Sequence, residues 1–243
     1  MSHFVKRCLI YIVGLFILSV GVVCMIKSNT GIAPWDALNV ALSELIGLTI
    51  GSWVFIVGGI LIFINSLIKM RFPNLAGFIP IVIIGSFVDL LNLKVLSFLK
   101  TDSVILQWSL FLIGLCILAM GIAIYLRASF PSIPNDELML AITERTGWGI
   151  NITKTIGEAL AFVLAIILQG PIGIGTIIVL LCLGILVGLF DKLLHKMGKP
   201  RSIYSVGHEA HIFMQAMIKL FIKCFFSPCV IQCEILITLS KKE

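Results

Sequence analysis

Charged residues are scarce in this sequence. Asp, Glu, Lys and Arg make up 12% of the 243 residues, about half of their share in soluble domains, while hydrophobic residues reach 59%. So much apolar surface excludes an ordinary soluble domain and predicts an all-helical, polytopic membrane protein. The net charge of +6 does not indicate nucleic-acid binding, because the basic residues are scattered between apolar runs and form no patch.

Motifs of enzymes and of cofactor sites are also missing. The sequence contains no glycine-rich nucleotide-binding loop and no nucleophile–base constellation. His208 and His211 in GHEAH are one residue too close for the HExxH signature. Cys224, Cys229 and Cys233 do not have a usual zinc spacing. We therefore expect no enzyme activity, no metal site and no cofactor.

The long uncharged runs predict the membrane-spanning helices, since about 20 apolar residues cross a bilayer. The run 159–190 is too long for one span, and Gln169-Gly170-Pro171 inside it predicts a break, because Pro lacks an amide donor. We predict six spans, at residues 8–26, 50–68, 74–93, 104–126, 150–168 and 172–193. The tryptophans are expected in the interfacial belts, at positions Trp35, Trp53, Trp108 and Trp148.

Two segments between the spans, 34–47 and 134–147, are shorter and more polar. Each begins with Pro, carries an acid in its first turn and ends at Gly, which suits the start and the end of a helix. We predict two short polar helices. They are short tilted spans, re-entrant half-helices or interfacial helices, and the sequence leaves these alternatives open.

The sequence also matches itself at an offset of 100 residues. GLFILSVG (14–21) aligns with GLCILAMG (114–121). Polar residues and helix breakers stay in register: Lys27 with Arg127, Pro34 with Pro134, Asp36 with Asp136, Glu44 with Glu144, and Gly47 with Gly147. Such residues rarely match by chance between apolar runs, so we predict an internal duplication. The predicted parts are a first repeat at 1–100, a second repeat at 101–201 and a C-terminal tail at 202–243, either amphipathic or poorly ordered.

The relative orientation of the repeats depends on whether the short helices cross the membrane. Four crossings in each half make the halves parallel, and three make them inverted. The basic residues fit both arrangements about equally well under the positive-inside rule. Both place the N-terminus, with Lys6 and Arg7, and the residues after Asp191 in the cytoplasm.

Ionisable side chains at membrane depth usually face a cavity or one another. Lys154 and Glu158 are four residues apart on one predicted helix, so they can pair, either to hold helices together or as part of an ion pathway. Asp36 and Asp136 either stabilise a helix start or, as equivalent residues of two repeats, face a ligand. The predicted substrate site consists of Lys27, Pro34, Asp36, Arg127, Pro134, Asp136, Lys154 and Glu158.

The stretch GLFILSVGVVCMIKSNTGIAPWDALNVALSELIGLTIGSWVFIVGGILI, followed by IGSFVDLL, resembles the YczE/YyaS/YitT-type bacterial integral membrane proteins. The resemblance covers about residues 8–198, and its most specific parts are P-W-D, I-G-S-W and F-V-D. In the second half, Asn135 stands where the first half has Trp35. The resemblance implies a protein of the bacterial cytoplasmic membrane without a settled mechanism.

These observations predict a secondary transporter or permease of a small solute, with a polar site between the two repeats. The alternative is a membrane scaffold or accessory protein that recruits a partner through the basic stretch after Asp191 and the tail. The expected partners are the lipid bilayer and a small-molecule or ion substrate, with no nucleic acid. The sequence predicts no oligomeric state.

Overall fold

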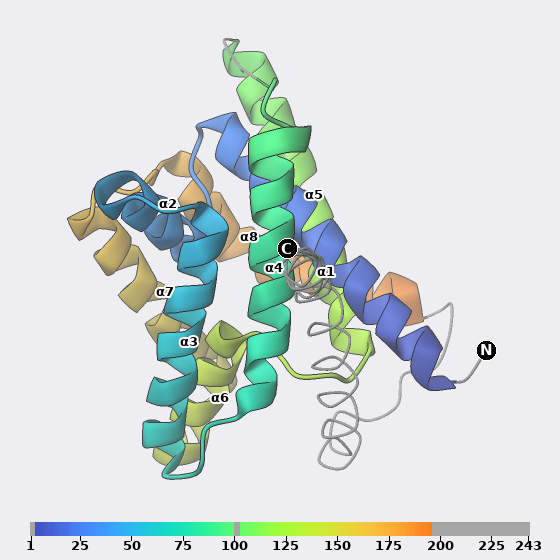
Figure 1. Ribbon diagram of the computed structural model, residues 1–243, viewed down its shortest axis with the longest axis vertical. Coiled ribbons are helices and arrows are strands. Elements are labelled where there is room, and N and C mark those ends of the chain that lie inside the picture. Colours follow the sequence, from blue (N-terminus) through green and yellow to red (C-terminus); the bar gives the residue numbers. More distant parts are fainter. Residues whose placement is uncertain (1–2, 100–102, 196–243) are drawn as a thin grey trace, which may run out of the picture. The chain divides into compact units, whose positions relative to one another are not determined.

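The computed structural model describes residues 3–99 and 103–195, and in these ranges the chain forms helices and contains no strand (Figure 1). This confirms the predicted all-helical class. The elements are α1 (His3–Ser28), α2 (Pro34–Ile46), α3 (Ile50–Lys69), the 3-10 turn η1 (Leu75–Gly77), α4 (Phe78–Leu90), the π-helical turn η2 (Leu91–Val95), α5 (Val104–Arg127), α6 (Pro134–Thr146), α7 (Ile150–Ile167) and α8 (Ile174–His195). The predicted tail, 202–243, lies outside the described residues.

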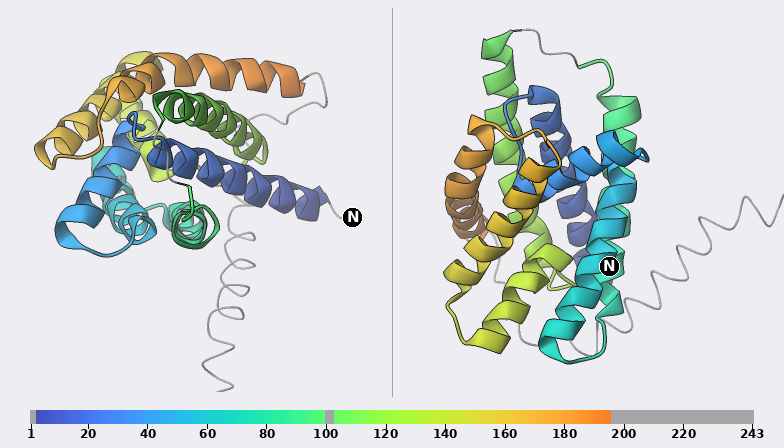
Figure 2. Two further views of the ribbon diagram at one scale, coloured as in Figure 1. Left: turned by 90° about the horizontal axis from the view of Figure 1, so that it is seen from above. Right: turned by 90° about the vertical axis from the view of Figure 1, so that its left-hand side faces the viewer.

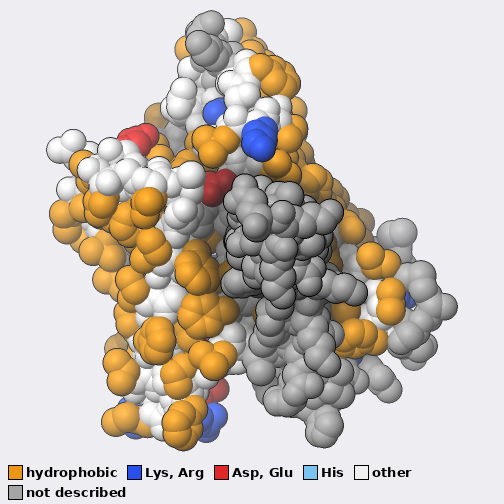
Figure 3. Space-filling model, viewed as in Figure 1, with side chains coloured by type: hydrophobic (Ala, Val, Ile, Leu, Met, Phe, Trp, Pro, Cys, Tyr) orange, Lys and Arg blue, Asp and Glu red, His pale blue; other side chains and the backbone are white. Residues whose placement is uncertain are grey.

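Five of the described segments are long and apolar enough to cross a membrane. They are Phe4–Ser28, Ile50–Lys69, Leu75–Val95, Val104–Arg127 and Ile174–Leu194. Hydrophobic side chains are spread over the described face in Figure 3, and charged ones are few. The remaining predicted span, 150–168, forms the 18-residue helix α7, which is not among the five.

The break predicted inside the long apolar run is present. α7 ends at Ile167 and α8 begins at Ile174, and Gln169 between them has a positive φ of 57°. This turn is packed tightly, because a Cβ added at Gly170 would lie 2.7 Å from the carbonyl oxygen of Ala37 in α2. The break therefore joins the end of α7 to a short helix of the other half of the chain.

Both short segments are helices, as predicted. α2 and α6 contain 13 residues each, and each begins with Pro. Each ends at a glycine with positive φ, 92° at Gly47 and 73° at Gly147, a conformation that favours glycine at a helix end. The helical length is about 20 Å at 1.5 Å per residue, less than a hydrocarbon core of about 30 Å.

The pair α1 and α5 packs side by side (Figure 2). Glycines let the two backbones approach, since a Cβ added at Gly14, Gly21 or Gly121 would come closer than 3.0 Å to the facing backbone. Gly14 faces Tyr125 and Gly21 faces Leu118, so residue numbers rise along one helix as they fall along the other. The two helices are antiparallel.

Tryptophan placement differs from the prediction in one case. Trp35 is 8% exposed and packs inside the protein rather than in an interfacial belt. The reason is its place in the first turn of α2, whose early residues are buried almost all round. Trp148 is 51% exposed, and Trp53 donates a hydrogen bond from Nε1 to the carbonyl oxygen of Gly47 at 2.7 Å.

Candidate functional site

Asp36 and Asp136 occupy the same position in the two short helices, the third residue of a helix that begins with Pro. An acidic side chain in the first turn is favoured by the unpaired amides and the positive end of the helix dipole. Both side chains are half-buried. The local sequence therefore fixes where these two carboxylates stand relative to their own helices.

Helix α7 contributes the other two charges. Lys154 and Glu158 are one turn apart, so they share a face of α7. Glu158 interacts electrostatically with Lys154, with Asp136 and with Asp36. Asp136 also interacts with Lys154. Because α7 packs on both α2 and α6, the structure brings together four of the residues predicted for the site, which we call the charged cluster (Asp36, Asp136, Lys154 and Glu158).

The charges of this cluster are near one another without direct ion pairs. Among the described residues, no carboxylate oxygen lies within 4.0 Å of the Lys154 ammonium. Lys154 is exposed and Glu158 is half-buried. The four groups therefore influence one another electrostatically, but the Lys154 ammonium forms no direct ion pair with any of the three acids.

Tyr125 fixes one member of the cluster. Its hydroxyl donates a hydrogen bond to Oδ2 of Asp136 at 2.6 Å. Tyr125 is 1% exposed and packs edge-on against Tyr11, whose hydroxyl donates to the carbonyl oxygen of Pro131 at 2.7 Å. The segment before α6 and the Asp136 carboxylate are thereby both anchored to the α1–α5 pair.

Asn39 is a polar group that the sequence analysis did not single out. It is 6% exposed, and its side-chain oxygen is buried without a hydrogen-bond partner among the described residues. It follows Asp36 by three residues on α2, a spacing that places neighbours on one side of a helix. An unpaired buried carbonyl is costly, by about 1–3 kcal/mol, so its position beside Asp36 bears on what the site binds.

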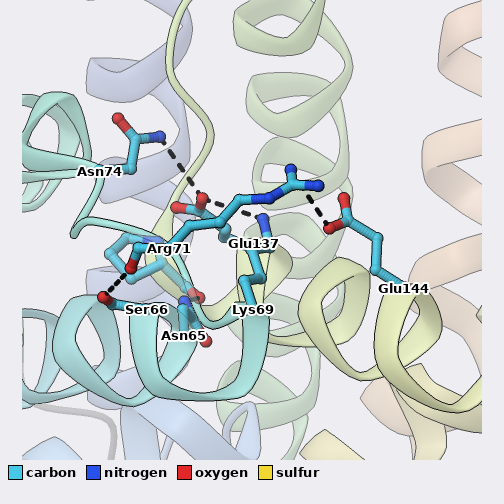
Figure 4. Close-up of polar contacts among 8 residues, drawn as sticks. Asn65, Ser66, Lys69, Arg71, Asn74, Glu137 and Glu144 are labelled. Carbon is cyan, nitrogen blue, oxygen red and sulfur yellow. Dashed lines mark hydrogen bonds and ion pairs between the residues drawn. The ribbon is translucent and has the colours of Figure 1, made fainter.

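A second polar group joins α3 to α6 (Figure 4). Glu137, next to Asp136, accepts from Lys69 Nζ at 3.2 Å and from Asn74 Nδ2 at 3.4 Å. Asn65 Nδ2 donates to the carbonyl oxygen of Pro134 at 2.9 Å. We call this group the polar bridge (Asn65, Lys69, Asn74, Pro134 and Glu137); it holds the start of α6 against the end of α3.

The remaining residues predicted for the site lie apart from the charged cluster or serve the backbone. Arg127 pairs with Asp191, with Nε 3.1 Å from Oδ1, and so links the ends of α5 and α8. Lys27 stands half-buried in the last turn of α1. Pro34 and Pro134 are buried at their helix starts.

The I-G-S-W and F-V-D stretches have a structural role. Asp89 accepts hydrogen bonds from the Thr49 hydroxyl at 2.5 Å and from the Gly51 amide at 2.8 Å. A Cβ added at Gly51 would collide with Gly85 and with Asp89 itself. Asp89 of α4 therefore caps the start of α3, and the glycine allows this close approach.

Comparison with known proteins assigns the family. A model of a family of unknown function (DUF6198) matches residues 5–192. The chain belongs to this family. It is 38% identical to an uncharacterized protein of Bacillus subtilis named YyaS over 196 residues, covering 80% of this chain and 98% of the relative.

Two further relatives extend this result. An uncharacterized membrane protein of Bacillus subtilis, YczE, is 34% identical over 189 residues, covering 76% of this chain and 86% of the relative. An uncharacterized protein of Haemophilus influenzae is 24% identical over 192 residues, covering 79% and 86%. No solved structure matches the chain. The resemblance to YczE and YyaS is thus confirmed, and together with the apolar helices it identifies an integral membrane protein.

Proposed function

We propose that the described part of the chain consists of two duplicated halves, α1–α4 and α5–α8, inserted in opposite orientations. The order and lengths of the helices in the two halves support this, because α2 and α6 begin 100 residues apart and are equally long. Several packing partners also correspond under exchange of the halves: α2 packs on α7 as α6 packs on α3, and α1 packs on α4 as α5 packs on α8, whereas the packing of α3 on α4 has no comparable counterpart between α7 and α8. Antiparallel α1 and α5 favour the inverted arrangement with three crossings per half.

We further propose that the protein is a secondary transporter or permease of a small solute. The observation that carries this is the charged cluster, which assembles from both short helix starts and from α7. In transporters built from inverted repeats, the substrate site lies between the repeats and is faced by the ends of interrupted helices. Ionisable groups inside a helical membrane protein that form no direct ion pair also suggest a functional site by default.

Two equivalent contacts join the halves, α6 on α3 and α2 on α7, and they differ in chemistry. This difference suits a transporter in which the two contacts open alternately and expose one site to each side of the membrane in turn. The polar bridge joins α6 to α3 through charged and amide groups. The corresponding contact of α2 with the end of α7 is made by small residues, with Gly170 close to Ala37 and Ala41. These are the two surfaces that we propose separate in turn during transport.

We place the protein in the cytoplasmic membrane with its N-terminus inside, and we propose that it performs no enzymatic reaction. The scaffold alternative depends on the residues after Asp191 and on the tail, almost all of which lie outside the described residues. No contact among the described residues favours that alternative.

Flux measured in liposomes tests the proposal. Reconstituted full-length protein is expected to move at least one solute of a panel that includes inorganic ions, organic cations, organic anions and neutral metabolites. Asp36→Asn, Asp136→Asn and Glu158→Gln should each reduce that flux by roughly tenfold or more, the effect of about 1.4 kcal/mol. Glu44→Gln is the matched control, because Glu44 is exposed on the same helix as Asp36. No flux of any solute, or equal flux in all variants, contradicts the proposal.

Cysteine accessibility tests the inverted topology separately. Single cysteines along α2 and α6 are labelled in a version without the natural cysteines, using a reagent that does not cross the membrane. We expect labelling of both ends of α2 from one side of the membrane, and of both ends of α6 from the other. Labelling of the two ends of one helix from opposite sides would show that it crosses and would favour parallel halves.

A further inference from the structure

The charged cluster contains three carboxyl groups, those of Asp36, Asp136 and Glu158, and a single ammonium, that of Lys154, on helices α2, α6 and α7, which pack together. With all four groups ionised, its charge balance is negative. Since that ammonium forms no direct ion pair within the described residues, the three carboxyl groups remain available to a positive charge brought by a ligand, and such a charge favours their ionised forms. The cluster therefore favours a cationic ligand over an anionic or neutral one.

The spacing of the carboxyl groups in the charged cluster favours an organic cation over a bare metal ion as the ligand. Metal ions bind oxygen ligands at about 2.0–2.6 Å, so the ligating side chains must converge on one point. Within residues 3–99 and 103–195, no three Asp, Glu, His or Cys side chains are grouped closely enough to share one ion. The three carboxyl groups of the cluster therefore do not converge as the ligands of a metal ion do, which suits a ligand that reaches them with separate N–H groups.

The side-chain oxygen of Asn39, a neutral hydrogen-bond acceptor, also favours a ligand with N–H groups. Asn39 presents a buried, unpaired side-chain oxygen one turn after Asp36. The side-chain oxygen of Asn39 needs a hydrogen-bond donor, and the nearby carboxylate of Asp36 can only accept hydrogen bonds when it is ionised. The Tyr125 hydroxyl, in contrast, already donates to Asp136. The site thus has an excess of acceptors, and an incoming group that only donates would complete it.

We infer that the charged cluster and Asn39 bind a small organic cation carrying an ammonium group. Its N–H groups donate to Asn39 and to the carboxylates of Asp36 and Glu158, while Lys154 occupies the same field as an internal competitor. This inference rests on the proposed transport function for its biological meaning, but binding can be measured independently of transport.

The test measures binding to the purified full-length protein in lipid nanodiscs by calorimetry. The probes are n-butylammonium and 1,4-diaminobutane, compared with n-butanol, butyrate, sodium and magnesium at constant ionic strength. We expect the amines alone to bind. Glu158→Gln and Asp36→Asn should each weaken amine binding by roughly tenfold, as the loss of one charge-assisted hydrogen bond implies, and Asn39→Leu should weaken it several-fold. Glu44→Gln, exposed on the same helix, should leave it unchanged.

The direction in which Lys154→Gln changes the amine affinity is the decisive result. Removal of the internal ammonium should strengthen amine binding several-fold, whereas an anionic ligand would lose affinity in this variant. Weaker amine binding in Lys154→Gln, or preferred binding of sodium, magnesium, butyrate or butanol, overturns the inference. Amine binding without any flux in liposomes supports the inference and contradicts transport. Flux of an anion or a neutral solute that the amines do not inhibit supports transport and overturns the inference.

Discussion

The polar bridge allows a quantitative test of how the two halves are held together. Lys69 and Glu137 have side chains that are only 16% and 11% exposed, with 3.2 Å between nitrogen and oxygen. With an effective dielectric constant of about 20, the Coulomb attraction at this distance is about 5 kcal/mol. Desolvation of both groups offsets part of it, so we expect a net coupling of about 2 kcal/mol, within the range for hydrogen bonds to charged groups.

A double-mutant cycle measures this coupling. Lys69→Met, Glu137→Gln and the double variant are unfolded reversibly by a denaturing detergent in mixed micelles, and the free energies of unfolding are compared. Each single variant should lose about 2–3 kcal/mol, because it leaves the other group buried without its charged partner. The double variant should lose clearly less than the sum of the two.

A neighbouring ion pair provides the control. Arg71 and Glu144 are 3.9 Å apart, but their side chains are 75% and 51% exposed. The cycle of Arg71→Met and Glu144→Gln should give a coupling of at most about 0.5 kcal/mol, as is usual for exposed pairs. A coupling at Lys69–Glu137 no larger than this control would refute the reasoning that burial makes the bridge strong.

Three further perturbations have expected outcomes. Gly21→Leu should abolish the monodisperse peak of folded protein in size-exclusion chromatography, since the added Cβ would collide with α5. Gly188→Leu should not, because Gly188 has open space around it. Equal behaviour of the two variants would contradict the close packing of α1 on α5. Asp89→Ala should lower the free energy of unfolding by about 1–3 kcal/mol, because two cap hydrogen bonds are lost, and an unchanged value would remove the capping role. Tyr125→Phe should leave stability nearly unchanged but alter solute flux or amine affinity several-fold through the freed Asp136 carboxylate, and unaltered flux and affinity would show that this hydrogen bond does not position the site.

The elements with marks in the sequence itself could be predicted. Pro at the start and Gly at the end delimit α2 and α6 to within one residue, and the Gln169-Gly170-Pro171 break separates α7 from α8. Lys154 and Glu158 were recognisable as neighbours because four residues make one helical turn. In each case the signal and the structure it predicts lie within a few residues of each other.

Contacts between distant residues could not be predicted in this way. Lys69 and Glu137 are 68 positions apart, and Arg127 and Asp191 are 64 apart, so only the packing of α3 on α6 and of α5 on α8 makes them partners. The direction of α5 relative to α1 was also open, since the basic residues fit both arrangements. Tyr125 had a weak signal, because it is a hydroxyl-bearing residue near the end of an apolar span.

The packing of each short helix on both halves has a consequence for the origin of this architecture. α2 packs on α7 as well as on α3, and α6 packs on α3 as well as on α7, so each short helix contacts both halves. If the halves descend from one ancestral gene, as we propose, its product would have formed a homodimer in which each short helix contacted both subunits. Because α1 and α5 are antiparallel, that ancestor had to enter the membrane in both orientations in equal numbers. Fusion of two copies would then have removed this need, and it would have freed one copy to acquire Lys154 and Glu158, where the other has Val54 and Gly58.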